Sequence, residues 1–356
     1  ANDFKALVEE GHSHGIEFYI DYINTYTDKN HSYYINNPEW YTINDSLLSN
    51  FSIRQLDYTN SDLIKQISSD IFFLIKEYDL DGYSIKGNPH INKLKKHIHN
   101  FHSSIEDKSI LQIIKSETRL PPVNGVRNKN VFNSSYNIEL YKAGREHFSS
   151  RNIDFIKLNN LIRRNLDYYK PINSMITSTS IPNQERFMSL VEKPSSESIL
   201  NKVSYERLFM FMLMNYSMPG IPSIFYGDEF GQKGKIGVDS NRDMKFHKAL
   251  TKLEANLKLK ISILNKIRKS YPSLSIGDFM VLREGLDYSV WLKSYFNEQL
   301  LILFNAGDKY KELNISLPFS VRSLISLLDE NHLKSEGSDV LNIVIPPHTS
   351  RVYLLN

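Results

Sequence analysis

Ionisable side chains follow three short apolar segments that are typical of buried strands. The segment "IEFYID" ends in Asp21, "GYSIK" ends in Lys86, and "SILQIIK" leads into Glu117. Carboxylates in such places can transfer protons or hold polar ligands, and a lysine beside them can compensate their charge. On spacing alone, a site for chemistry and an ion-pair cluster that merely neutralises one edge of a sheet are equally good interpretations.

The segments that must position these residues alternate between strand and helix patterns as far as residue 270. We expect strands at 16–21, 82–86, 109–115, 172–178 and 221–227, and helices at 3–14, 62–78, 91–105, 155–169, 204–216 and 247–269. This alternation predicts an α/β fold with a parallel sheet covered on both faces, either a (β/α) barrel or a doubly wound sheet. No Gly-rich phosphate loop follows the first strand, which argues against a dinucleotide-binding fold. In a barrel, the carboxyl ends of the strands form the face that carries the active site.

The last part of the chain predicts a different architecture. Five segments with strand composition follow residue 275, with turn residues and no helical pattern between them: "YSVWLKS", "QLLILFN", "ELNISL", "DVLNIVI" and "RVYLL". We therefore expect two domains. The first is a barrel over 1–272 with a short insert at about 24–57, and the second is an antiparallel β-sandwich over 273–356.

The composition argues against several function classes. The chain has 43 basic and 40 acidic residues, so its charge does not indicate a nucleic-acid partner. It has no cysteine, which excludes disulfides and a cysteine nucleophile. The apolar run at 208–214 is too short to cross a bilayer and no signal-peptide pattern is seen, so we expect a soluble protein with no membrane partner and leave its compartment open. We expect no cofactor and no metal, since His97, His99 and His102 do not all share one helix face.

Several segments resemble, in one order, the α-amylase family of retaining α-glucoside-active enzymes. The segment "MPGIPSIFYGDEFG" (218–231) is similar to the family's eighth strand. The others are "ALVEEGHSHGIEFYIDYINTYT", "NPEWYT", "RQLDYTNSDLIKQI", "EYDLDGYSIK", "IIKSETRLP" and "LNKIRKSYPSLSIGDF". The resemblance covers nearly the whole chain and implies a (β/α)8 TIM-type barrel with a C-terminal β domain.

The family's first two barrel strands have no counterpart before the helix expected at 3–14. We therefore expect an N-terminally truncated barrel. Three explanations are open: the chain is a fragment, another polypeptide supplies the missing strands, or the start of the chain is disordered. We favour a fragment.

The family's mechanism uses two carboxylates about 5 Å apart, one as nucleophile and one as acid/base. Matched to this sequence, the resemblance places Glu117 at the acid/base position and Asp21 at a conserved sugar-binding carboxylate. The nucleophile position is Lys86, and the position of the arginine that orients the nucleophile is Ser84. Ile181 stands in place of the third carboxylate.

The remaining sugar-binding positions of the family are also altered. In the preferred register the Asn-His-Asp motif of strand seven reads Thr179, Ser180 and Ile181, and a slip of one residue gives 178–180 instead. Neither register supplies a carboxylate or an imidazole. Tyr26 and His90 join Asp21 and Ser180 as candidates for contact with substrate. Packing of the tyrosine in a small subdomain and an ordinary loop hydrogen bond of the histidine are the competing interpretations.

A cation at the nucleophile position opposes the positive charge that develops on the sugar during hydrolysis. We expect Lys86 to remain charged and to form an ion pair with Glu117 or Asp21. The predicted function is thus an α-amylase-family protein of carbohydrate metabolism that is catalytically inactive and acts as a glycan-binding or interaction scaffold. Its partner would be an α-linked oligosaccharide or glucan. The alternative is an active α-glucan hydrolase or transglycosidase with Glu117 as acid/base and an unrecognised nucleophile.

Overall fold

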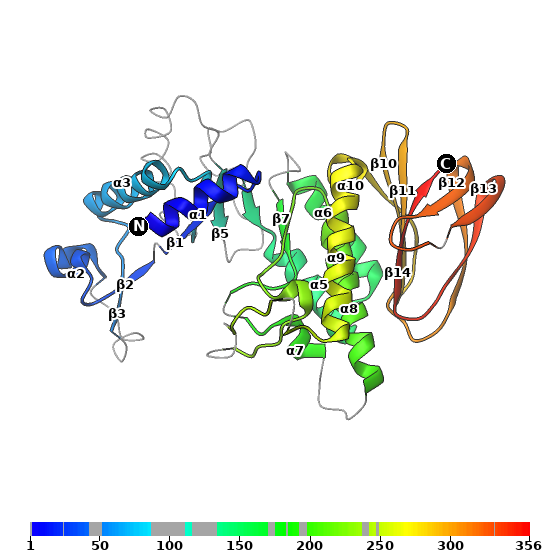
Figure 1. Ribbon diagram of the computed structural model, residues 1–356, viewed down its shortest axis with the longest axis horizontal. Coiled ribbons are helices and arrows are strands. Elements are labelled where there is room, and N and C mark those ends of the chain that lie inside the picture. The colour runs from blue at the N-terminus through cyan, green and yellow to red at the C-terminus, as the bar shows by residue number, and fades with distance from the viewer. Residues whose placement is uncertain are drawn as a thin grey trace. The chain divides into compact units, whose positions relative to one another are not determined.

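The protein is described from a computed structural model. The description covers residues 2–23, 25–42, 52–86, 111–115, 134–169, 175–182, 184–191, 198–236, 242–246, 249–330 and 332–356. They form two compact units, Ala1–Tyr136 and Asn137–Asn356 (Figure 1). Each unit is described by itself.

The first unit is built on four parallel strands in the order β1-β4-β5-β6. Their bounds are Tyr19–Tyr22, Gly82–Lys86, Leu111–Lys115 and Ser134–Tyr136. Helix α1 (Asn2–Ser13) precedes β1, and α3 (Ser61–Tyr78) precedes β4. The Asn60 side chain caps the start of α3, and the helix ends at Asp79, which has a left-handed backbone conformation. The apolar face of α3 forms the centre of the core of this unit.

A small antiparallel subdomain lies between β1 and α3. It consists of β2 (Tyr26–Asp28), α2 (Ser32–Asn36), the 3-10 helix η1 (Pro38–Trp40) and β3 (Ile53–Gln55). Strands β2 and β3 pair with each other. Trp40 and Tyr41 are buried and belong to the same core as α3. The subdomain is therefore packed onto the helix that positions β4.

The second unit begins with helices around two short parallel strands, β7 (Met175–Ser178) and β8 (Ile221–Ser223). The helices are α5 (Ile138–Ser150), α6 (Phe155–Tyr168), α7 (Phe187–Val191), α8 (Ser198–Ser217) and α9 (Lys252–Ser270). The apolar run 208–214 lies in α8 and is buried throughout. It is buried because α8 packs against α5, α7 and α9; α8 and α9 lie side by side in Figure 1.

The end of the chain forms a six-stranded antiparallel sheet in the order β13-β12-β14-β11-β10-β9. A single helical turn, α10 (Ser273–Ile276), leads into it. The strands are β9 (Asp278–Glu284), β10 (Tyr288–Tyr295), β11 (Glu298–Asn305), β12 (Lys311–Ser326), β13 (Leu333–Ile345) and β14 (Thr349–Leu355). Inward residues from β10 and β11 share one core with residues from β12 and β13. The Arg283 side chain of β9 donates to the Asn314 carbonyl of β12, at 3.0 Å, so the sheet folds back over itself.

Several elements escaped the sequence patterns, among them three that lie close to the predicted ones. Strand β6 and helix α5 were not expected, and neither was β9, whose residues alternate in burial at the start of the C-terminal sheet. Strand β6 spans only three residues, too few for a period-2 pattern to be seen. The helix expected at 91–105 lies outside the described residues. Among the described residues, no helix combines the length and apolar character needed to span a membrane.

Candidate functional site

The carboxyl ends of β1, β4 and β5 bring the first group of predicted site residues together. Parallel pairing sets Asp21 opposite Ser84, and it sets Lys86 opposite Lys115. Residues two apart on a strand point to the same face. Ser84 and Lys86 therefore share a face of the sheet with Lys115, as the alternation in "GYSIK" predicts.

Asp21 has two partners on the neighbouring strands. The Ser84 hydroxyl donates to Oδ1 of Asp21 at 2.7 Å, and Ser84 itself is buried. The Lys115 ammonium forms an ion pair with Oδ2 of the same carboxylate. Lys115 also lies 5.9 Å from the centre of the Tyr136 ring. Both oxygens of Asp21 are thus occupied, one by a neutral donor and one by a cation.

Lys86 is exposed at the end of β4. Its predicted partner Glu117 lies outside the described residues, as does His90, and the ion pair of Lys86 with Glu117 or Asp21 stays a prediction. The charged residues described at this edge are Asp21, Lys86 and Lys115. Among the described residues, this edge of the sheet therefore carries two positive charges and one negative charge.

The second group of predicted site residues lies at the end of β7. Thr179 and Ser180 are buried and Ile181 is half-buried. The Thr179 hydroxyl donates to Oδ2 of Asp228 at 2.7 Å. The Ser180 hydroxyl makes no hydrogen bond of normal geometry with a described residue, but it lies near the same carboxylate and favours its ionised form, which opposes the rise that burial causes in the pKa of Asp228. Thr179 and Ser180 offer hydroxyl groups where the resemblance would place an amide and an imidazole, and Ile181 offers an apolar side chain where it would place a carboxylate.

Asp228 is held in a buried ion pair. The guanidinium of Arg186 lies 3.3 Å from Oδ1 of Asp228, and the two side chains are 1% and 3% exposed. The same guanidinium lies 4.1 Å from the centre of the Phe225 ring and donates to the Tyr226 carbonyl. Burial raises the pKa of Asp228 above its ordinary value, although the bonds from Thr179 and Arg186 favour the ionised form.

The arrangement of Asp228 is structural, because its carboxylate connects the loop after β8 to Thr179 and Arg186. The Asp228 carboxylate bonds to the side chains of Thr179 and Arg186, and Arg186 in turn makes the backbone contact. The reason is that a fully buried carboxylate needs a cation beside it, and Arg186 supplies the charge that a backbone amide lacks.

Aromatic residues of the subdomain after β1 belong mainly to a packed core. Tyr33 and Trp40 make an edge-to-face contact at 5.3 Å, and Tyr34 and Tyr41 make one at 5.0 Å. Tyr26 differs, because its side chain on β2 is 43% exposed. Contact of Tyr26 with substrate stays a prediction, as it does for Asp21, His90 and Ser180.

Two charged residues of these clusters were missed by the sequence patterns, namely Lys115 and Arg186. Lys115 is the last residue of a predicted strand, and its distance in sequence from Asp21 hides their contact. The alternation of "LQIIK" could have placed it on the same face as Glu117, two residues later. In the described part of the chain, no group of three or more His, Asp or Glu side chains is arranged to hold a metal ion.

Comparison with known sequences gives partial matches. No protein-family model matches the chain. A cyclomaltodextrinase of Geobacillus thermopakistaniensis (strain MAS1) is 26% identical over 148 residues, which is 41% of this chain. An amylopullulanase of Thermoanaerobacter thermohydrosulfuricus is 26% identical over 138 residues, or 36% of this chain. The aligned parts span 24% and 9% of the lengths of these two relatives.

Comparison with solved structures covers almost the whole chain. An Anoxybacillus α-amylase matches with a TM-score of 0.82 and 22% identity, covering 99% of this chain and 79% of that one. The α-amylase from Geobacillus thermoleovorans, complexed with acarbose, matches with a TM-score of 0.81 and 20% identity, covering 100% and 80%. A debranching enzyme from Nostoc punctiforme matches with a TM-score of 0.78 and 18% identity, covering 99% and 78%.

These likenesses define the class of protein: a barrel of the (β/α)8 type followed by a C-terminal antiparallel β domain. The two sequence matches, each at 26% identity and over less than half of this chain, agree with the resemblance of its motifs to the α-amylase family.

Proposed function

We propose that this chain is a non-hydrolysing member of the α-amylase family that binds α-linked oligosaccharides. The observation that carries the proposal is the charge at the ends of β1, β4 and β5. Lys86 occupies the position that the resemblance assigns to the nucleophile, and Lys115 neutralises the Asp21 carboxylate. With Glu117 included, the cluster would contain two cations and two carboxylates, and its net charge would be zero.

Retaining hydrolysis places different demands on such a site. A carboxylate must attack the sugar, and the transition state gathers positive charge on the ring. An ammonium group at the place of attack raises the energy of that state, and it also removes the nucleophile. Replacement of the orienting arginine by Ser84 agrees with the loss of the nucleophilic carboxylate, because an arginine at this position would have no anion to orient.

Binding of sugar does not require this chemistry. Sugar hydroxyls are neutral groups that donate and accept hydrogen bonds. The Asp21 carboxylate can accept from them through its remaining lone pairs, and the Lys115 ammonium can donate through its remaining hydrogens. The exposed ring of Tyr26 offers an apolar face to a sugar ring. One of the structural relatives was solved with acarbose and another with maltose, which supports an α-linked oligosaccharide as the ligand to test.

The test measures binding and turnover on the full chain. We expect maltoheptaose to bind in calorimetry, with no release of reducing ends from soluble starch above the rate without protein. Tyr26→Ala should weaken binding about fivefold, because it removes an aromatic contact. Tyr310→Ala is the matched control, since Tyr310 is 66% exposed in the C-terminal β domain, and its affinity should equal that of the unaltered chain.

Two outcomes would overturn the proposal. Turnover that disappears in Glu117→Gln and persists in Glu146→Gln would establish a hydrolase or transglycosidase with Glu117 as acid/base. Glu146 is a suitable control because it is exposed on α5. Absence of both binding and turnover would leave an interaction scaffold as the function of the barrel.

A further inference from the structure

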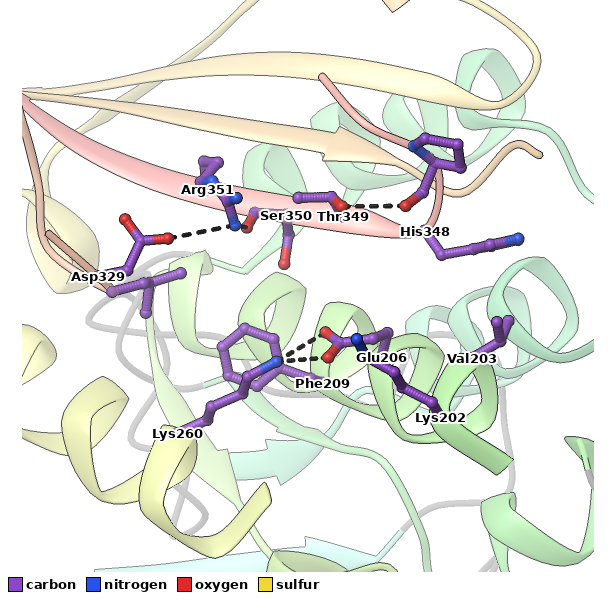
Figure 2. Close-up of a pocket in the computed structure, with 12 residues that line it drawn as sticks. Lys202, Val203, Glu206, Phe209, Lys260, Asp329, His348, Thr349, Ser350 and Arg351 are labelled. Carbon is purple, nitrogen blue, oxygen red and sulfur yellow. Dashed lines mark hydrogen bonds and ion pairs between the residues drawn. The ribbon is translucent and has the colours of Figure 1, made fainter. Parts of the chain in front are cut away.

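A pocket in the second unit lies between helices α8 and α9 and the end of the C-terminal sheet. Its volume is about 430 Å³, within the range of pockets that hold small ligands. One wall is formed by Lys202, Glu206 and Phe209 of α8 with Lys260 of α9. The opposite wall is formed by residues of β14 and the turns beside it (Figure 2). Neither the sequence patterns nor the comparisons assign a role to this pocket.

A buried hydroxyl points into this pocket. Ser350 of β14 is 4% exposed, and its Oγ has no hydrogen-bond partner among the described residues. Figure 2 shows the Ser350 side chain directed from β14 toward α8 and Glu206. A buried hydroxyl without a partner loses the hydrogen bonds that it made to water, which costs about 1–3 kcal/mol. A ligand that accepts a hydrogen bond from Ser350 would recover this loss.

The carboxylates that line the pocket are already neutralised. Both oxygens of Glu206 accept from the Lys260 ammonium, at 2.6 and 2.8 Å. Asp329 accepts from the Ser326 hydroxyl at 2.7 Å and lies 3.5 Å from the Arg351 guanidinium. Neither carboxylate therefore presents an uncompensated charge to a ligand.

One cation of the pocket has no such partner among the residues that the structure describes. Lys202 is exposed and forms no ion pair with a described residue. The lining thus holds Lys202, Lys260 and Arg351 against Glu206 and Asp329, a surplus of one positive charge. This surplus favours an anion over a neutral or cationic ligand.

A histidine adds a requirement that separates phosphate from carboxylate. Nε2 of His348 lies 2.9 Å from the Asp308 carboxylate, so the ring proton is donated there. Nδ1 of the same ring is buried without a partner among the described residues. Burial lowers the pKa of His348; the charges of Arg207 and Arg151 lower it further, and the charge of Asp308 raises it. The ring is therefore neutral at pH 7, and Nδ1 is an acceptor. An ionised carboxylate has no proton to give to Nδ1, whereas a hydrogen phosphate group or the hydroxyl of a phosphate ester has one.

We propose that this pocket binds a small phosphate-bearing ligand, either inorganic phosphate or a sugar phosphate. Ser350 donates to a phosphate oxygen, Lys202 balances its charge, and Nδ1 of His348 accepts from an O–H of the ligand. The site lies within the second unit and does not depend on the function proposed for the strand ends of the first unit.

The test titrates the full chain with inorganic phosphate and with glucose 1-phosphate in calorimetry at pH 7 and constant ionic strength. We expect one site for at least one of the two probes. Ser350→Ala and Lys202→Gln should each weaken it about tenfold, because each removes a hydrogen bond to a charged group. Lys266→Gln is the matched control, an exposed lysine of α9 outside the pocket, and it should leave the affinity unchanged. Tighter binding of glucose 1-phosphate would assign the site to the ester, and equal or weaker binding would assign it to free phosphate.

Three results would overturn the proposal. The first is absence of binding for both phosphate probes. The second is an equal effect of Lys202→Gln and Lys266→Gln, which would indicate general charge attraction. The third is competition by acetate or maltose at the concentrations at which phosphate binds, since acetate lacks the proton for Nδ1 and maltose lacks the charge. Ser350→Ala removes an unpartnered hydroxyl, so the thermal unfolding temperature of this variant should not fall. That measurement shows that a loss of binding in Ser350→Ala does not result from a loss of folding.

Discussion

At the scale of single residues, the end of β7 depends on one buried charge pair. Asp228 and Arg186 are almost fully buried, and each is the other's counter-ion. Thr179 adds a hydrogen bond to the carboxylate, and the Phe225 ring lies against the guanidinium. Removing one member of such a pair leaves the other charge buried without compensation, which is far more costly than losing a surface ion pair.

We predict that Asp228→Asn lowers the free energy of unfolding by about 3–5 kcal/mol, because Arg186 keeps its charge. Chemical denaturation followed by circular dichroism measures this change. Thr179→Val should cost only about 1–2 kcal/mol, since it removes one hydrogen bond and no charge. Equal losses in the two variants would show that the ion pair contributes little.

At the scale of elements, a buried histidine connects helix α5 to the start of α6. His147 is fully buried in the last turn of α5, and its Nδ1 lies 2.5 Å from the Ile153 carbonyl. Its ring packs against Phe148 and Phe155. Burial lowers the pKa of His147 from 6.5 to about 4. The junction therefore requires a neutral imidazole.

The stability of the second unit should accordingly depend on pH. Between pH 6.5 and 4 the unfolded chain binds a proton at His147 and the folded chain does not, so the free energy of unfolding falls as the pH is lowered through this window. The loss attributable to this residue is about 3 kcal/mol. In His147→Phe the difference in stability between pH 7 and pH 4 should shrink by that amount, as measured by denaturation at each pH. His14→Gln, which alters an exposed histidine, should keep the full difference; the same shrinkage in both variants would contradict the assignment.

At the scale of the whole molecule, the second unit joins helices of the barrel type to the C-terminal sheet through a buried amide. Asn159 of α6 is fully buried. Its amide group donates to Glu284 of β9 and Ser289 of β10, and its oxygen accepts from the Trp291 indole at 3.0 Å. An aromatic contact between Phe155 and Phe304 lies across the same junction, at 5.7 Å. The helices and the sheet are therefore expected to unfold together.

We predict that Asn159→Leu lowers the free energy of unfolding by about 3 kcal/mol, because three partners of the amide lose their bond in a buried place. It should also separate the unfolding of the C-terminal sheet from that of the helices. Calorimetry measures the loss of stability. Trp291 fluorescence and far-ultraviolet circular dichroism, recorded during the same unfolding, show whether the sheet and the helices unfold in separate transitions. Asn160→Leu is the control, since Asn160 is the exposed neighbour on the same helix. A single unaltered transition in Asn159→Leu would show that the junction does not couple the two parts.

The sequence by itself determined the alternation of strands and helices, the change to an antiparallel domain and the absence of cysteine chemistry. These features follow from local periodicity and composition, which each segment carries in its own residues. It also placed Ser84 and Lys86 on one strand face, because alternation along a strand is a local property, and the register of β4 agrees. The domain boundary at 272 and the role of Glu117 remain predictions of the sequence.

Only the tertiary structure decided which groups meet. Asp21 is neutralised by Lys115, 94 residues away, because parallel pairing aligns their strands; no local pattern carries that information. The same holds for Arg186 beside Asp228 and for Asn159 beneath the C-terminal sheet. The pocket at Ser350 arises where β14 faces α8, and Ser350 in a strand pattern looks like any other small polar residue. Contacts between distant segments depend on how elements pack, so only the folded chain reveals the charges and hydroxyls that a ligand would meet.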